Sequence, residues 1–400
     1  MALRSAAGCL VGLALAFAQP AVAATPPGGV YAIIAANTPA QDPVATQALQ
    51  VPGVDGLLIH LRWADISPAT KQYNWTTLDR VVQIALAANK RFEIGIETGS
   101  QTPAWMFTPK SAGGMGAPHA TFTVDAFSAE QCYTFDMAPP YSAAYLSAFN
   151  DMLAQLAKHL RRTGAYKHLS MIKLSGITTT TDELRLPAVG GCEGANSVQL
   201  WQSLGYTPGK VQAAWRQMLQ MYLKHFPEKA FNIGFIGVNA FPAINADGGA
   251  APADKAKHLS AKFVAALIAD ASTTMPGKLA VGFDSLTFNV PSTVVSYRQS
   301  RKQFLDDVAA ANARPGWQTN ELLGSYPKDG AACGGNTQQN AVACANAAEF
   351  RKMLLRGVFP HGQADTPPSQ WGVYLEVFPQ NVVAFPAAIA PAHDKLGGWN

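Results

Sequence analysis

The sequence predicts an α/β protein, a (β/α)8 (TIM) barrel with elaborated strand-to-helix loops. Strand-like and helix-like patterns alternate along the chain, which favours a parallel sheet covered by helices. Eight apolar runs qualify as strands. Most of them are nearly continuous, as expected for strands buried on both faces. An open doubly wound sheet is the alternative, but the Gly-rich phosphate-binding turn of that fold is missing after the first strand.

The expected strands are short runs rich in aliphatic, β-branched and aromatic residues. In chain order they are Val30–Ala35, Val54–Arg62, Phe92–Glu97, Leu169–Gly176, Phe231–Val238, Leu279–Phe283, Gly316–Asn320 and Gly372–Phe378.

Several stretches between these strands carry apolar side chains at helical spacing. The clearest stripe covers 145–160, and others cover 259–268 and 350–358. Thr76, followed three residues later by Asp79, predicts the start of a helix. Alternating strands and helices of this kind predict a barrel, whose active rim is built by the loops that follow the strands.

Four long segments account for the length beyond a minimal barrel, and all are rich in Gly, Pro, Ala and Asn. They are Pro109–Pro140, Arg185–Gly209, Asn239–Asp254 and Leu322–Val342. Each follows a strand, so the sequence predicts an extended site at the C-terminal rim of the barrel.

The N-terminus has the pattern of a secretory signal peptide. Arg4 precedes an apolar run at Leu10–Phe17, and Ala21-Val22-Ala23 is a small-residue cleavage site. We therefore expect residues 1–23 to be removed, residues 24–400 to form one barrel domain, and the protein to be secreted or periplasmic. No later run is long enough to span a membrane.

The charge argues against two classes of partner, and the cysteine content fits an exported protein. The net charge of +4 is small, so neither nucleic acid nor an anionic membrane is an expected partner. Outside the signal there are four cysteines, Cys132, Cys192, Cys333 and Cys344, which allow three pairings. Cys333 and Cys344 flank one Gly/Asn/Gln-rich loop and favour a local bridge, which leaves Cys132 to pair with Cys192.

Two glutamates follow strands whose ends should share one rim. Glu183 comes after the fourth expected strand and a run of four threonines. Glu321 follows the polar end of the seventh strand, directly after Asn320. Two carboxylates that face each other across a pocket can hydrolyse a glycosidic bond by acid–base chemistry. The alternatives are a loop or helix-start acid for Glu183 and a buried ion pair for Glu321.

Further candidates lie at the same rim. Arg62 ends the second strand and Glu97 the third, so Arg62 either keeps a catalytic carboxylate ionised or pairs with Glu97. Trp63 and Trp105 could stack on sugar rings, with partial burial in the core as the alternative. Glu376, at the end of the eighth strand, is a third carboxylate candidate.

Two more side chains are weaker candidates. Asp284 ends the sixth strand, and His60 lies one step before the rim, where a hydrogen-bonded core histidine is the expected role. The sequence has no HExxH pair, P-loop, GxSxG elbow or clustered Cys/His ligands. It therefore predicts no metal and no cofactor.

The stretch LLIHLRWADISPATKQYNWTTLDRVVQIALAANKRFEIGIETGSQTPAW, Leu57 to Trp105, resembles the second and third units of clan A glycoside hydrolases, above all family 42 and related family 5 barrels. The matching features are the aromatic after strand two, the ISP…YNW…LD passage and the TPAW loop. The resemblance implies a retaining enzyme with an acid/base after strand four and a nucleophile after strand seven, here Glu183 and Glu321. It departs at Asp182, where the clan has an asparagine that binds the sugar 2-hydroxyl.

The sequence thus predicts a secreted retaining glycoside hydrolase that cleaves a β-linked oligosaccharide or polysaccharide. Two alternatives stay open. One is a non-catalytic carbohydrate-binding barrel, in which the carboxylates are locked in salt bridges. The other is a different hydrolase on the same barrel that uses Glu97 or Glu376.

Overall fold

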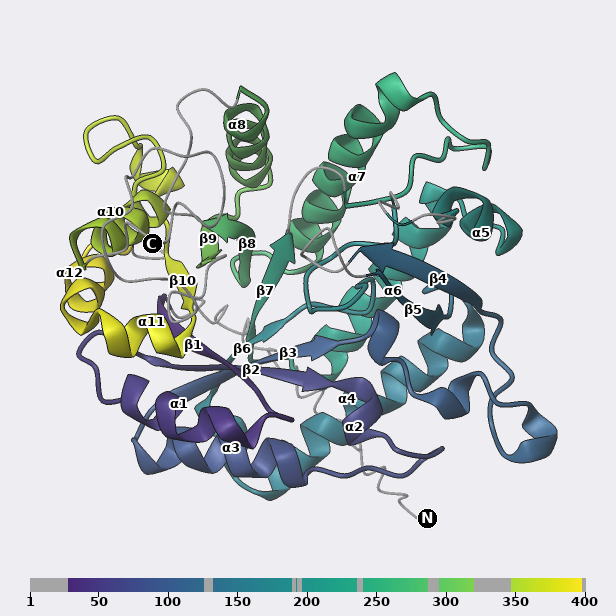
Figure 1. Ribbon diagram of the computed structural model, residues 1–400, viewed down its shortest axis with the longest axis horizontal. Helices are drawn as coiled ribbons and strands as arrows, with labels where there is room; N and C mark the ends of the chain where they lie inside the picture. The colour runs from purple at the N-terminus through teal and green to yellow at the C-terminus, as the bar shows by residue number, and fades with distance from the viewer. Residues whose placement is uncertain are drawn as a thin grey trace, which may run out of the picture.

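The chain folds into a closed barrel of eight parallel strands with helices around it (Figure 1). The structure is a computed structural model, and it describes residues 28–125, 132–188, 192, 196–235, 240–286, 295–319 and 347–397. Around the barrel the order is β1-β10-β9-β8-β7-β6-β3-β2, so that β1 closes the barrel between β2 and β10. The predicted fold class is confirmed.

All eight predicted strands are present, with ends that shift by a few residues. They are β1 (Gly29–Ala35), β2 (Gly56–Arg62), β3 (Arg91–Glu97), β6 (Leu169–Lys173), β7 (Ala230–Phe235), β8 (Leu279–Leu286), β9 (Arg314–Thr319) and β10 (Tyr374–Val377). Within the described ranges, two ends differ by three residues: β8 continues to Leu286, and β6 ends at Lys173 instead of Gly176. The chain leaves the sheet there and turns at Gly176, whose φ of +104° lies in the region that favours glycine.

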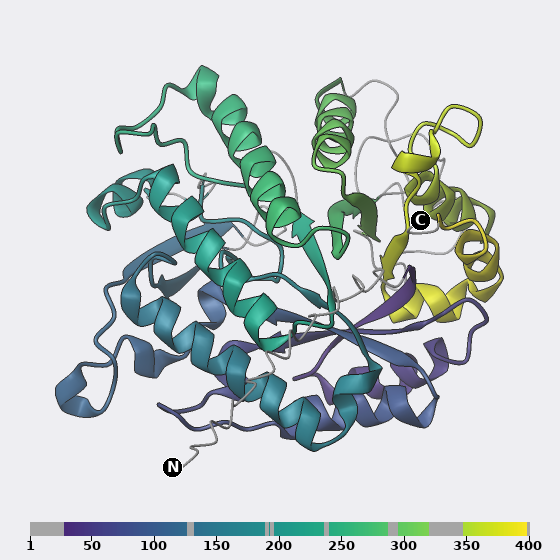
Figure 2. The same ribbon diagram turned by 180° about the vertical axis from the view of Figure 1, so that it is seen from behind.

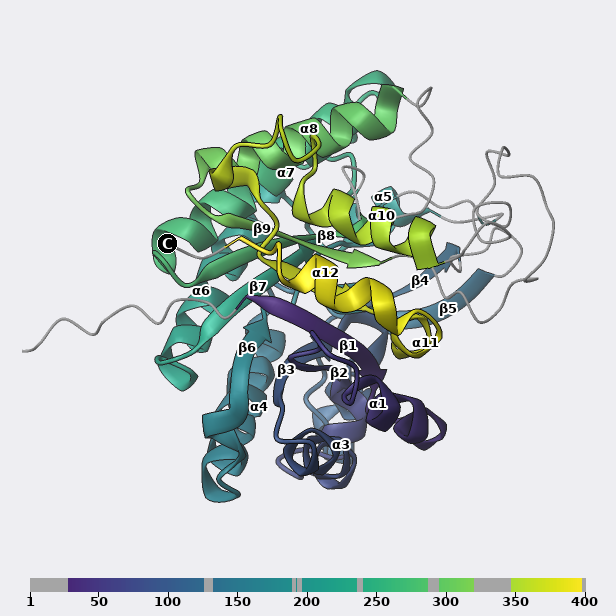
Figure 3. The same cartoon turned by 90° about the vertical axis from the view of Figure 1, so that its left-hand side faces the viewer.

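The helices cover the outside of the barrel. They are α1 (Asp42–Ala48), α2 (Trp63–Ile66), α3 (Thr76–Ala87), α4 (Ala143–Arg162), α5 (Ser197–Ser203), α6 (Pro208–His225), α7 (Ala253–Thr274), α8 (Val295–Ala310), α10 (Ala347–Val358), α11 (Pro379–Ala384) and α12 (Ile389–His393). Seen from behind, α4, α6 and α7 follow one another around one side (Figure 2). On another side α11 and α12 pack beside β1 (Figure 3). No described helix is both long and apolar enough to cross a bilayer.

One helix start and one loop differ in detail from the prediction. Helix α3 begins at Thr76 as predicted, but the Thr76 backbone N–H is accepted by Asn74 Oδ1 at 3.1 Å. The segment expected as the loop Pro109–Pro140 contains an antiparallel hairpin, β4 (Ala120–Asp125) with β5 (Cys132–Met137), that packs on α5. The alternating pattern at 120–125 and 132–137 is the sequence signal for this hairpin.

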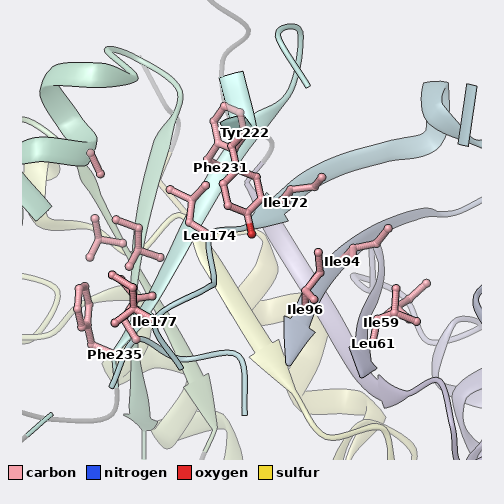
Figure 4. Close-up of a cluster of buried hydrophobic side chains, with 14 of the residues drawn as sticks. Ile59, Leu61, Ile94, Ile96, Ile172, Leu174, Ile177, Tyr222, Phe231 and Phe235 are labelled. Atoms are coloured by element: carbon pink, nitrogen blue, oxygen red, sulfur yellow. The ribbon is translucent and has the colours of Figure 1, made fainter. Parts of the chain in front are cut away.

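Strand periodicity separates an apolar outer layer from the barrel interior. Ile59 and Leu61 of β2, with Ile94 and Ile96 of β3, belong to the cluster that packs against the helices (Figure 4). Their neighbours along each strand point the opposite way, into the barrel. The interior has a separate apolar cluster of Tyr31, Ile33, Leu58, Met171, Ala230, Ala280, Val373 and Tyr374.

Candidate active site

Level with the interior apolar cluster and above it, side chains that point into the barrel are polar or charged. Glu93 on β3, Lys173 on β6, Asn232 on β7 and Glu376 on β10 are all buried. Buried charges are costly unless they are paired. The contacts among these side chains therefore decide what the mouth of the barrel can do.

Lys173 and Glu376 form the central ion pair. Lys173 Nζ lies 3.0 Å from Glu376 Oε2 and donates to Gln318 Oε1 at 3.3 Å. Asn232 Nδ2 donates to the other oxygen of Glu376 at 3.0 Å. Glu376, predicted as a rim carboxylate, thus lies below the mouth with both of its oxygens occupied.

Asp182 lies directly above this pair and is fully buried, with 0% exposure. Its carboxylate is 3.4 Å from Lys173 Nζ and 3.5 Å from His60 Nε2. It also occupies the space over Gly95, where an added Cβ would be 1.8 Å from Asp182 Oδ2. Glycine at 95 therefore makes room for this carboxylate on the barrel axis.

The segment after β6 crosses the mouth and is held at both sides. Thr178 Oγ1 contacts Thr98 Oγ1, just after β3, at 2.6 Å. Six residues further on, Leu184 N donates to Gly234 O of β7 at 2.9 Å. Between these anchors the chain brings Asp182 and Glu183 to the C-terminal end of the barrel, as the sequence predicts for Glu183.

His60, Glu97 and Arg62 continue the charged cluster to the rim. His60 Nδ1 is 3.5 Å from Glu97 Oε1, and Arg62 Nε is 3.5 Å from Glu97 Oε2. Of the two roles open for Arg62, the structure shows the pair with Glu97. The Arg62 side chain is 43% exposed. From Glu376 to Arg62 the charges alternate in sign, and we call these six side chains the charge ladder: Glu376, Lys173, Asp182, His60, Glu97 and Arg62.

We expect His60 to be protonated at neutral pH. Burial lowers its pKa, but the carboxylates of Asp182 and Glu97 outweigh that effect and raise the pKa from 6.5 to about 9. Because the folded-state pKa of His60 is higher than the unfolded one, this charge stabilises the fold fully below pH 6.5. The contribution is lost as the pH rises through about 9.

An NMR titration of the histidine rings should show that His60 has a pKa of about 9, with the His60→Gln variant used to assign its signals. The Asp182→Asn substitution should lower the pKa of His60. Titration of His60 at or below its ordinary value would contradict the ladder.

Glu183 is also buried, with 2% exposure, but it lies outside the charge ladder. Its Oε2 accepts a hydrogen bond from Thr181 Oγ1. Arg185 donates to Thr180 Oγ1 at 2.6 Å and so holds the same turn. Glu183 thus has a fixed position next to Asp182, while the ion pairs of this turn are made by Asp182.

The two tryptophans, both candidates for sugar stacking, lie in different environments. Trp63 is completely buried and packs edge-on against Tyr145 and Phe149, with centroids 5.4 and 5.7 Å away. Its ring cannot reach a substrate, so Trp63 is a core residue, which was the alternative to sugar stacking. Trp105, in the 3₁₀ turn Ala104–Met106, is half-buried, and its Nε1 donates to Ser67 O at 2.7 Å.

Several predicted residues lie outside the described residues: Asn320, Glu321, Cys333 and Cys344. The side chain of Asp284 is not described either. The Cys132–Cys192 disulfide is confirmed, with a Cα–Cα distance of 5.9 Å, and it ties β5 to the long segment after β6. Within the described ranges, no group of three or more His, Cys, Asp or Glu side chains could hold a metal ion.

Three interior residues were not predicted as site residues from the sequence: Glu93, Lys173 and Asn232. A signal for them was present, because each is a polar residue between two apolar neighbours in the sequence. A buried strand tolerates such a residue only where partners satisfy it. The partners themselves could not be named, because they come from strands far apart in the chain.

Comparison with solved structures gives the same fold. The catalytic domain of β-amylase from Paenibacillus polymyxa superposes with a TM-score of 0.56 and 11% sequence identity, over 91% of this chain and 99% of that one. A β-galactosidase from the psychrophilic Marinomonas ef1 has a TM-score of 0.49 and 12% identity, over 92% of this chain and 59% of that one. A GH10 protein from Paenibacillus barcinonensis has a TM-score of 0.47 and 13% identity, over 88% and 83%.

At such identities the similarity shows the fold alone, which places the chain in the class of (β/α)8 barrels. No protein-family model matches the chain, and no curated protein is similar to it in sequence.

Proposed function

We propose that the protein is a secreted glycoside hydrolase that acts at the C-terminal mouth of the barrel and retains the configuration of the sugar. Glu183 is the acid/base and Glu321 the nucleophile. The observation that carries the proposal is the buried position of Glu183 in the segment that follows the fourth barrel strand, β6, beside the charge ladder. β9, the seventh barrel strand in chain order, ends at Thr319, two residues before Glu321. The solved structure that shares the fold is the catalytic domain of a β-amylase.

The mechanism has two displacements. Glu321 attacks the anomeric carbon while Glu183 gives its proton to the leaving oxygen, so that the glycosidic bond breaks and a glycosyl–enzyme ester forms. Glu183 then takes a proton from water, whose oxygen attacks the same carbon and releases Glu321. Such enzymes place the two carboxyl groups ~5–5.5 Å apart.

A non-catalytic carbohydrate-binding barrel is the second candidate. The observation that favours it is the pairing of Asp182 with Lys173 and His60, together with the pairing of Glu97 with His60 and Arg62. For a hydrolase that uses other carboxylates, Glu97 is a better candidate than Glu376, because Glu376 lies beneath the mouth.

A screen of chromogenic β-glycosides and polysaccharides separates these functions. Binding without turnover on every substrate would favour the non-catalytic barrel.

The leaving group tests the role of Glu183. Glu183→Gln should lose about 10²–10⁴-fold in rate on natural glycans, because a general acid contributes that much to departure of a poor leaving group. It should lose far less on dinitrophenyl glycosides, whose leaving group needs no proton. Glu228→Gln, on the exposed surface, is the matched control and should keep wild-type rates. Equal losses on both substrates would remove Glu183 from the acid role.

A further inference from the structure

Beneath the charge ladder, two glutamates share one tyrosine hydroxyl. Tyr374 Oη lies within hydrogen-bond distance of Glu93 Oε2 and, at 2.6 Å, of Glu376 Oε1. Glu93, Tyr374 and Glu376 are all buried inside the barrel. Water cannot screen these groups, so the number of protons among them is decided by their own contacts.

A phenol has one proton and can donate it to only one of two carboxylates. If both glutamates were ionised, the second short contact would bring two oxygens together without a proton between them. One carboxyl group must therefore be protonated and donate to Tyr374 Oη. Burial raises the pKa of the Tyr374 hydroxyl well above its ordinary range, so the phenol keeps its own proton.

The contacts of the two glutamates decide which one is protonated. Both oxygens of Glu376 accept from other donors, Lys173 Nζ at 3.0 Å and Asn232 Nδ2 at 3.0 Å. For Glu93, Tyr374 is the described hydrogen-bond donor. A carboxylate that faces an ammonium group keeps its charge more readily than one that faces a neutral phenol.

We propose that Glu93 is a protonated, neutral carboxylic acid at neutral pH and acts as a positioning residue for the mouth. The protonated Glu93 donates a hydrogen bond to Tyr374 Oη, and Tyr374 donates its own hydroxyl proton to Glu376. Lys173 then bridges Glu376 and Asp182, and His60 bridges Asp182 and Glu97. The neutral acid thus leaves one negative charge at the base of the ladder, on Glu376, where Lys173 pairs with it.

The surroundings of Glu93 agree with this assignment. Burial is the main cause that raises its pKa well above the ordinary range, and the negative charges of Glu376 and Asp55 add to it. The hydrogen bond from Tyr374 and the charge of Lys173 oppose the rise. From β1, Tyr31 also faces this carboxyl group, and the pKa of its own hydroxyl is raised, mainly by burial.

Two matched variants test the proposal. Glu93→Gln keeps a neutral group that can donate to Tyr374 Oη, so its denaturant midpoint at pH 8 should equal or exceed that of wild type. Glu376→Gln removes the charge that faces Lys173 and should lower the midpoint or prevent folding. A Glu93→Gln variant that is as damaged as Glu376→Gln, or that does not fold, overturns the proposal.

The pH dependence gives a readout that packing alone would not change. Above about pH 4.3 the glutamate at position 93 loses its proton in the unfolded chain but keeps it in the folded protein. The contribution of Glu93 to the free energy of unfolding of wild type therefore falls as the pH rises. The advantage of Glu93→Gln over wild type should therefore grow from pH 5 to pH 8, and a constant difference counts against the proposal. In infrared spectra at pH 8, wild type should show a protonated-carboxyl band that loses the intensity of one carboxyl group in Glu93→Gln. No such band in wild type, or a band of undiminished intensity in the variant, also overturns the assignment. None of these measurements requires a substrate, so they stand apart from the proposed hydrolysis.

Discussion

Glu321→Gln is expected to abolish turnover of glycosides and to leave oligosaccharide binding intact. A neutral amide cannot attack the anomeric carbon, but it occupies the same volume as the carboxylate. Removing one member of a catalytic unit costs on the order of 10⁴-fold or more in kcat. Turnover is measured on the best substrate from the screen, and binding by calorimetry with the matching oligosaccharide.

Chemical rescue makes this prediction specific to the nucleophile. In Glu321→Ala, added azide should attack the anomeric carbon and give a glycosyl azide of inverted configuration, which NMR identifies. Glu228→Gln again serves as the surface control. Unchanged turnover in Glu321→Gln would eliminate the nucleophile assignment and, with it, the two-glutamate mechanism.

Lys173→Met is expected to cause the largest loss of stability of any single substitution in the barrel interior. Lys173 Nζ lies between Glu376 at 3.0 Å and Asp182 at 3.4 Å, and all three side chains are buried. Removing one partner of a buried ion pair costs about 3–5 kcal/mol, because the remaining charges lose their compensation. Chemical denaturation at pH 7 measures the loss.

The pH dependence of this loss identifies its cause. Burial raises the pKa of Glu376 and the charge of Lys173 opposes that rise, so without the lysine the folded-state pKa of Glu376 rises further. The deficit should therefore be largest above pH ~4.3 and shrink as the pH falls towards it. The double variant Lys173→Met/Glu376→Gln should recover part of the stability. Lys158→Met, on the exposed face of α4, should stay within about 0.5 kcal/mol of wild type. A loss that is independent of pH would indicate a packing defect instead.

The barrel could be predicted because its signals are local. Strands buried on both faces consist of apolar runs, and the helices between them show one apolar stripe each, so both patterns appear in short windows of sequence. The position of Glu183 at the rim followed from the same order of elements. The β4–β5 hairpin was missed because a Gly- and Pro-rich segment was expected to be a loop throughout.

The partners of the interior charges could not be predicted from local patterns. Lys173 and Glu376 are separated by 203 residues and meet only because β6 and β10 face each other across the barrel. Trp63 lies one residue beyond β2, in helix α2, and only the structure shows that it is completely buried. Each of these placements depends on which way a side chain points at the end of a strand.

By itself the sequence determined the order of strands and helices, the closed parallel sheet and the rim at which Glu183 lies, because burial and periodicity act on neighbouring residues. Only the tertiary structure decided that Asp182 points into the barrel and that alternating charges connect Glu376 to Arg62. Closing the barrel brings distant strands within ion-pair distance in a space without bulk water, where each charge needs a specific partner.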